Sequence, residues 1–175
     1  MIGKNGSVFL DGYFVSDRAI VIKGQRIEKI IPNEEAGADA FDLKGKFLVP
    51  GLVDLQLNGE AGHFFANDIS EESIRCIQEV NLKYGTTAFL LTLPNCPYDS
   101  IFKAIETVRQ YQKQYPGLLG LHIEGPYINP VKKGAHPIEY IRQPDMNELK
   151  SIIEAGRDVI RMITIAPELF HPDQL

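Results

Sequence analysis

The stretch VPGLVDLQLNG, residues 49–59, marks a change in the organisation of the chain. We interpret it as the end of a buried strand. Alternation along such a strand places Asp54, Gln56 and Asn58 on one face and Leu55 and Leu57 on the other. Because polar side chains on a buried strand are costly unless something binds them, this polar face is a candidate functional surface.

The residues before this stretch are predicted to form β-hairpins. The segments SVFL and YFV flank Asp11-Gly12, a dipeptide favoured in two-residue turns. The segment AIVIKGQRIEKII places two β-branched runs around Gly24. No helical pattern of adequate length is visible here, so residues 1–50 are assigned to an N-terminal β region.

After residue 50, predicted strands alternate with predicted helices. Strands are expected at LVDLQL (52–57), TTAFLLTL (86–93), LLGLHIEGP (118–126) and VIRMITIAPE (159–168), with helices within 70–85, 98–117 and 146–156. The first of these helices has clear boundaries, since Ser70 is a typical N-cap and Gly85 a typical stop. This spacing is typical of successive β/α units with a parallel sheet.

Two α/β architectures compete for residues 51–175. A doubly wound sheet could close with four or five strands, but its phosphate-binding glycine fingerprint is absent after the first strand. A (β/α)8 TIM-type barrel needs roughly 250 residues, and four strands supply only its first half. We therefore expect the first four β/α units of a barrel, incomplete as given, behind the strands of residues 1–50.

Composition excludes several classes of protein. The chain is 44% hydrophobic with a formal net charge of -5, and its longest basic block is the Lys132-Lys133 pair, which argues against a nucleic-acid or membrane-surface partner. No apolar run reaches the roughly 20 residues of a membrane span. Cys76 and Cys96 show no metal-type spacing. A cytoplasmic localisation is expected.

Active sites of parallel β/α proteins lie at the carboxyl ends of the strands, which selects Glu124 first. A carboxylate at the end of a buried strand costs several kcal/mol unless it is ionised against a partner. A divalent metal would be one such partner, because zinc accepts carboxylate oxygen. A structural glutamate held by backbone amides or by a distant lysine is the other interpretation, and both remain open from position alone.

The histidines and lysines near Glu124 are weaker candidates. His122 fits a hydrogen-bonded core histidine better than a direct metal ligand. His136, in the following loop, is a substrate contact or an ordinary exposed histidine. Lys132 and Lys133 could attract an anion, although solvated lysines are the commoner case.

Three motifs together resemble one family. VPGLVDLQLNG, LGLHIEGPYINPVKKGAHP and ITIAPEL are similar, in sequence and spacing, to N-acetylglucosamine-6-phosphate deacetylases of the amidohydrolase superfamily. The resemblance runs from about Gly3 to Leu175, and the family is nearly twice this length. It implies an N-terminal portion, with residues 1–50 forming strands of a small β-sandwich and residues 51–175 the first half of the barrel.

The resemblance also implies a reaction and its residues. The activity would be hydrolysis of the N-acetyl group of N-acetylglucosamine 6-phosphate, with one divalent metal ion, zinc or another first-row ion, bound by Glu124. Ala135 and His136 match the substrate-binding loop, and Gln56, Asn58 and His122 would line the active site. The family's catalytic Asp and two metal-binding histidines would fall beyond Leu175, so this chain alone is expected to be inactive.

One departure from the wider superfamily concerns the number of metal ions. Many amidohydrolases end the first barrel strand in His-x-His, whereas this chain has Gln56 and Asn58, whose carboxamides bind zinc-like ions poorly. One metal is therefore expected rather than two.

The resemblance further implies a homo-oligomer, a dimer in the full-length family. An N-acetylgalactosamine-6-phosphate deacetylase and a non-catalytic half-barrel module are the alternatives.

Overall fold

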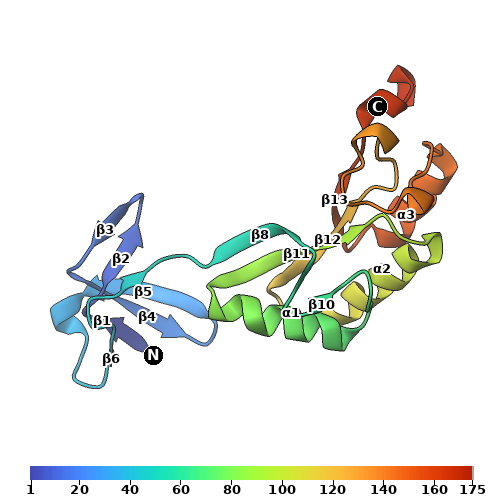
Figure 1. Cartoon of the computed structure of the whole chain (residues 1–175). Helices are drawn as coiled ribbons and strands as arrows, with labels where there is room; N and C mark the ends of the chain where they lie inside the picture. Colours follow the sequence, from blue (N-terminus) through green and yellow to red (C-terminus); the bar gives the residue numbers. More distant parts are fainter. Residues whose placement is uncertain (175) are drawn as a thin grey trace. The chain divides into compact units, whose positions relative to one another are not determined.

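The computed structural model describes residues 1–174, which divide into two compact units. The first unit is Met1–Pro50 and the second begins at Gly51 (Figure 1). Within the described residues, none of the helices has the length and apolar character needed to cross a membrane.

The first unit consists of two small sheets. One has the strand order β5-β4-β1-β6 and the other β3-β2-β7. The strands are β1 (Ile2–Lys4), β2 (Ser7–Leu10), β3 (Tyr13–Val15), β4 (Arg18–Lys23), β5 (Arg26–Pro32), β6 (Phe41–Asp42) and β7 (Phe47–Leu48). The predicted hairpins β2–β3 and β4–β5 are confirmed as antiparallel pairs. Asp11 and Gly12 both have positive φ angles, 50° and 91°, as the two-residue turn requires.

The second unit is built on a four-stranded parallel sheet with the order β13-β12-β11-β8. Its strands are β8 (Leu52–Leu57), β11 (Thr86–Pro94), β12 (Leu118–Glu124) and β13 (Ile160–Thr164), and its helices are α1 (Glu71–Lys83), α2 (Tyr98–Gln112) and α3 (Met146–Gly156). Each helix connects two neighbouring strands, so the predicted β/α alternation is confirmed. Ser70 caps α1 as predicted, since its side chain accepts a hydrogen bond from the Ser73 amide.

Short elements complete the second unit. A small hairpin, β9 (Gly59–Glu60) and β10 (His63–Phe64), follows β8. Single turns of 3-10 helix lie at η2 (Pro130–Lys132), η3 (Ile138–Tyr140), η4 (Pro167–Leu169) and η5 (Pro172–Gln174), and the first unit holds η1 (Asn33–Glu35). The hairpin was not predicted, because two-residue strands are too short to give an alternation pattern.

One apolar core lies between the sheet and its helices. Helices α1 and α2 pack along the sheet, and α3 packs against α2 (Figure 1). Alternate residues of β11 and β12, such as Leu91, Leu93, Leu121 and Ile123, point into this core and are almost fully buried. The residues between them, such as Thr92 and His122, occupy the opposite face of the sheet.

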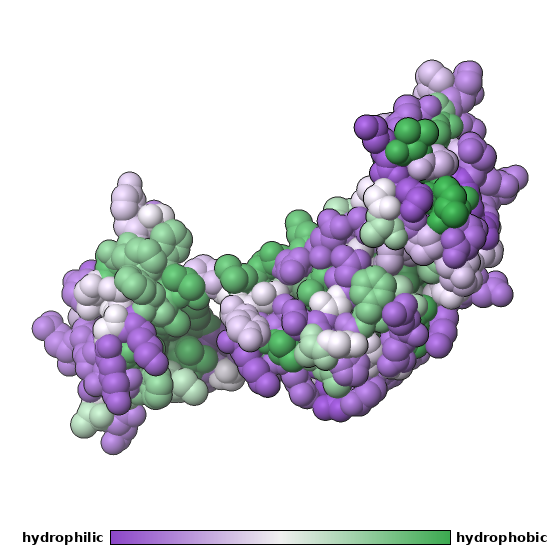
Figure 2. Space-filling model, in the orientation of Figure 1, coloured by the Kyte–Doolittle hydropathy of each residue, from purple (hydrophilic) through white to green (hydrophobic). Residues whose placement is uncertain are grey.

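The expectation of a buried strand at residues 52–57 is wrong for most of β8. Leu52, Val53 and Leu55 are each more than half exposed, and only Leu57 enters the core. The physical reason is that β8 lies at the edge of the sheet and pairs only with β11. Figure 2 shows apolar side chains at the surface along this strand.

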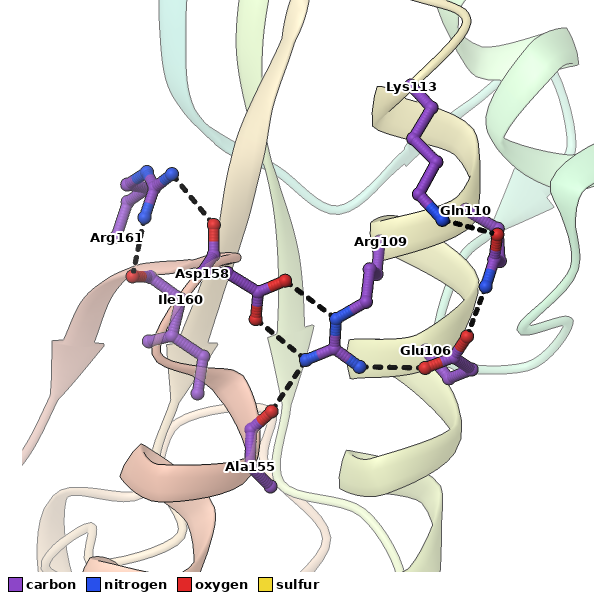
Figure 3. Close-up of polar contacts among 8 residues, drawn as sticks. All are labelled: Glu106, Arg109, Gln110, Lys113, Ala155, Asp158, Ile160 and Arg161. Carbon is purple, nitrogen blue, oxygen red and sulfur yellow. Dashed lines mark hydrogen bonds and ion pairs between the residues drawn. The ribbon is translucent and has the colours of Figure 1, made fainter.

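A polar cluster links α2 to the turn between α3 and β13 (Figure 3). The Arg109 guanidinium donates from Nε and Nη2 to the two carboxylate oxygens of Asp158, each at 2.7 Å. It also donates to the Ala155 carbonyl at 2.6 Å and to Glu106 at 2.7 Å. This bidentate geometry fixes the α3–β13 turn against α2 at the end of the sheet opposite the candidate site.

The cluster predicts an acid-dependent loss of stability. The hydrogen bonds from Arg109 lower the pKa of Asp158 from 3.8 to about 2. Because the folded pKa lies below the unfolded one, the stabilisation is complete above about pH 4 and disappears as the pH falls through 2. Asp158 is largely exposed, so we expect Asp158→Asn to cost only about 1 kcal/mol at pH 6.

Urea unfolding of the wild type and of Asp158→Asn at pH 6 and pH 2 measures this contribution. The difference between the two proteins should shrink towards zero at pH 2. A difference that stays constant with pH would show that Arg109 does not stabilise the ionised form of Asp158.

The hydroxyl of Tyr111 provides a second stability prediction. Its ring stacks on Tyr115 with centroids 4.2 Å apart, and its buried hydroxyl has no hydrogen-bond partner among the described residues. Burial raises the pKa of Tyr111 to about 12. Since an unsatisfied buried hydroxyl is destabilising, Tyr111→Phe should raise the free energy of unfolding by about 1 kcal/mol in urea denaturation.

The control is the same substitution at Tyr127, which is also fully buried. Its hydroxyl donates to the Asp145 carbonyl and to Glu148, so Tyr127→Phe should lower the unfolding free energy by about 1 kcal/mol. Equal destabilisation by both substitutions would contradict the account of Tyr111.

Candidate active site

A pocket of about 790 Å³ opens at the carboxyl ends of the parallel strands. Its lining comes from the last residues of β11, β12 and β13 and from the segments that follow β8, β11 and β12. All four strands of the sheet therefore contribute, which is the general placement of active sites in parallel β/α proteins. The volume lies within the range of small-molecule sites.

Glu124 lies in this pocket as the last residue of β12. Its Oε1 accepts a hydrogen bond of 2.7 Å from the Gln56 side-chain amide. Its Oε2 lies 3.7 Å from Nε2 of His136. No lysine or arginine forms an ion pair with Glu124 among the described residues, so the carboxylate keeps one oxygen available towards the pocket.

The three polar side chains that the sequence placed on one face of β8 make different contacts in the structure. Gln56 reaches across the sheet to Glu124, and Asn58 lines the pocket. Asp54 instead accepts a hydrogen bond of 2.9 Å from the Gln56 backbone amide. The sequence predicted a shared polar face, and the structure brings two of its three side chains to the site.

His122 lies beneath the pocket and is not part of its lining. Its Nδ1 is 3.2 Å from the Thr92 hydroxyl, and its Nε2 is 2.8 Å from the Thr164 hydroxyl. Only 2% of the residue is exposed, and this burial lowers the pKa of the imidazole, so the ring is neutral at pH 7. With both nitrogens bonded to threonines, His122 is a hydrogen-bonded core histidine, the preferred interpretation of its pattern.

The loop after β12 carries Ala135 and His136 into the pocket. The amide of Asn95 donates to Nδ1 of His136 over 3.3 Å. Lys133 folds back on its own loop, because its ammonium donates to the carbonyls of His136 at 3.0 Å and Gly134 at 3.3 Å. Lys133 therefore closes the loop, whereas Lys132 lines the pocket and makes no comparable bond to any other described residue.

Sequence reasoning missed Asn95 and Thr164. Asn95 is 5% exposed, lines the pocket and donates its side-chain amide to the Pro126 carbonyl. Both residues lie at strand ends, the only sequence signal available, and that signal did not separate them from their neighbours.

Cys96 also lines the pocket, but burial raises the pKa of its thiol to about 11, so it is protonated and unreactive at pH 7.

The described residues do not by themselves provide a complete set of metal ligands in the pocket. Within residues 1–174, no three side chains among His, Cys, Asp and Glu come together closely enough to hold a metal ion. Glu124 offers one free carboxylate oxygen, which fits a hard or borderline cation. A catalytic zinc usually takes three protein ligands, so a complete site needs donors besides those described here.

The fold and pocket place the chain among α/β proteins with a site at the ends of a parallel sheet. It is 43% identical over 155 residues to N-acetylglucosamine-6-phosphate deacetylase of Haemophilus influenzae, a match covering 87% of this chain and 40% of that relative. It is 32% identical over 137 residues to N-acetylgalactosamine-6-phosphate deacetylase of a Shewanella species, covering 77% of this chain and 34% of that relative. No family model matches the sequence.

The fold agrees with these relatives. The crystal structure of N-acetylglucosamine-6-phosphate deacetylase from Pasteurella multocida superposes with a TM-score of 0.89 at 38% identity, over 95% of this chain and 45% of that one. The chain is therefore homologous to N-acetylglucosamine-6-phosphate deacetylases, and an N-terminal portion of such an enzyme fits the match. The resemblance predicted from the motifs is confirmed, and the chain spans about 40% of the length of the curated relatives that it matches.

Proposed function

We propose that this chain forms part of a metal-dependent hydrolase that removes the acetyl group of N-acetylglucosamine 6-phosphate, giving acetate and glucosamine 6-phosphate. The observation that carries the proposal is the position of Glu124 in a pocket at the ends of four parallel strands. It is supported by the 43% identity of the chain to an N-acetylglucosamine-6-phosphate deacetylase. On this proposal the second unit is the first half of a (β/α)8 barrel, and the first unit contributes strands to a small sandwich.

Glu124 would be the first ligand of one divalent metal ion, zinc in our proposal. Such an ion, when bound, activates water and polarises the acetyl carbonyl. Gln56 holds one carboxylate oxygen of Glu124, and this bond fixes the direction in which the other oxygen points. A single ion is proposed because the carboxamides of Gln56 and Asn58 are weak ligands for such metals.

The loop that carries His136 would bind the sugar. The Nε2 atom of His136 faces the pocket beside Glu124, where it can donate a hydrogen bond to a substrate oxygen. Ala135 presents a small side chain at the same wall, which leaves room for a sugar ring. We further propose a cytoplasmic homodimer with a small sugar phosphate as its only ligand besides the metal, and with no nucleic-acid or membrane partner.

We propose that these 175 residues have no deacetylase activity alone, because Glu124 is the only carboxylate that lines the pocket among residues 1–174. The test is a chimera in which this chain replaces the matched portion of the Haemophilus influenzae relative. With zinc, the chimera should release acetate from N-acetylglucosamine 6-phosphate, whereas the chain alone should release none. A folded chimera without acetate release would contradict the proposed function.

The second candidate substrate is N-acetylgalactosamine 6-phosphate, since the Shewanella relative carries that name at 32% identity. The two sugars differ in the configuration of a single hydroxyl, and the higher identity to the Haemophilus influenzae relative favours the gluco sugar. Assaying the chimera with both sugar phosphates distinguishes them. A higher kcat/KM for the galacto sugar would reverse the assignment.

A further inference from the structure

We propose that Glu148 is a positioning residue that fastens both ends of the pocket loop, residues 127–142, to the start of α3. The pocket loop lies between β12 and α3, and it supplies the wall that contains Ala135 and His136. The inference rests on the proposed function only in taking this pocket as the place where the sugar phosphate binds.

The start of the pocket loop is held through Tyr127, which is fully buried. Its hydroxyl donates to Oε1 of Glu148 at 3.0 Å, with the Asp145 carbonyl as a longer alternative acceptor at 3.2 Å. Burial raises the pKa of Tyr127, so the hydroxyl keeps its proton and remains a donor at neutral pH. Since both acceptors belong to the beginning of α3, this end of the loop is tied to that helix.

The end of the pocket loop is held through Arg142. Its guanidinium forms an ion pair with Oε2 of Glu148, the second oxygen of the same carboxylate. The guanidinium also lies over the Tyr98 ring, 4.8 Å from the centroid. The Arg142 backbone amide donates to the Pro126 carbonyl at 3.1 Å, so the loop closes on itself. Its two ends therefore meet at one carboxylate.

The surroundings of Glu148 suit this double role. Only 15% of its side chain is exposed, so its pair with Arg142 is screened less than a surface pair. It lies in the first turn of α3, where the helix dipole favours a negative charge. Glutamine at this position has a single acceptor oxygen beside an NH2 group, so it can hold only one of the two donors.

The consequence is a separation between ligand binding and metal binding. Glu124 belongs to β12 and lies outside the pocket loop, so releasing the loop should leave the proposed metal ligand in place. Release lowers the population of loops in the binding position, and the apparent affinity for a ligand falls in the same proportion. Changes at Glu148 should thus weaken binding of the sugar phosphate and leave zinc binding intact.

Amide hydrogen exchange of the 175-residue chain, followed by NMR, tests the fastening directly. Two amides report on the loop ends: Arg142 donates to the Pro126 carbonyl at 3.1 Å, and Ala166 donates to the Tyr127 carbonyl at 2.8 Å. Both should exchange about tenfold faster, or more, in Glu148→Ala. In Glu148→Gln, which keeps the size of the side chain, the Arg142 amide should exchange faster by a similar factor. An unchanged Arg142 amide in either variant would overturn the proposal.

Two controls separate loop release from a general loss of stability. The Leu121 amide, which donates to the Val159 carbonyl at 2.8 Å, should keep its exchange rate in both Glu148 variants. Asp158→Asn removes the charge of another carboxylate paired with an arginine, and it should leave the Arg142 amide unchanged. Equal acceleration of the Leu121 and Arg142 amides in the Glu148 variants would overturn the proposal.

The kinetic readout uses the chimera with N-acetylglucosamine 6-phosphate. In Glu148→Gln we expect KM to rise about tenfold, with kcat within about twofold and one zinc ion still bound. Asp158→Asn should leave KM unchanged. An unchanged KM in Glu148→Gln, or a loss of zinc, would contradict the proposed role. Because hydrogen exchange needs no activity, failure of the proposed deacetylation would appear separately, as a chimera that releases no acetate.

Discussion

Glu124→Gln should reduce acetate release by the chimera more than about a hundredfold, since changes to groups behind a metal ligand already cost 10–100-fold. The substitution keeps the size of the side chain, and its amide oxygen can still accept the hydrogen bond from Gln56. What it removes is the negative charge, and carboxamide oxygens bind zinc-like ions weakly. The measurement is kcat/KM for N-acetylglucosamine 6-phosphate at saturating zinc.

The matched control is Glu154→Gln, the same substitution at an exposed position of α3 outside the pocket. Glu154 is exposed and forms an ion pair with Lys150 at 4.0 Å, so its substitution should leave kcat/KM within a factor of about two. If the Glu124→Gln chimera keeps its activity, Glu124 is not needed for catalysis. The interpretation of Glu124 as a structural glutamate would then hold.

Gly125→Ala should have the largest effect on stability, about 3 kcal/mol, from overpacking and backbone strain together. Gly125 has a φ of 120°, a conformation that L-residues rarely adopt. A Cβ there would also lie 1.7 Å from the Oδ1 of Asn95, a side chain buried in the pocket wall. The midpoint of urea unfolding measures the loss.

The control for strain alone is Gly134→Ala in the loop that carries His136. Gly134 has a φ of 59°, and an added Cβ would meet nothing within 4 Å. It should therefore cost only about 1 kcal/mol, from the left-handed conformation. If Gly125→Ala were no more destabilising than Gly134→Ala, the close packing of Asn95 on Gly125 would not be a constraint on the fold.

The order of elements was predictable because local patterns dominate it. Ser70 caps α1, Asp11-Gly12 closes the first hairpin, and the apolar run of β11 is buried as its composition predicts. The exposure of β8 was not predictable, because its apolar pattern is the same whether or not a neighbour covers the strand. Burial of a strand depends on its position in the sheet, which local sequence does not determine.

The candidate site was predictable in part for a similar reason. Strand ends meet at one edge of a parallel sheet, so the convergence of Glu124, Asn58 and His136 on one pocket follows from topology. The bond between the Asn95 amide and His136 could not be predicted, since it joins a backbone group to a loop 41 residues away. The pairing of His122 with Thr92 and Thr164 likewise requires the register of three strands.

The central claim is that Glu124 brings a metal ion to this pocket, and the metal content of the purified chimera tests it most directly. After incubation with zinc and removal of the excess, elemental analysis should find one ion per wild-type chain. The Glu124→Gln chimera should retain no zinc above the background of a metal-free buffer. Equal zinc content in the two proteins would contradict the claim.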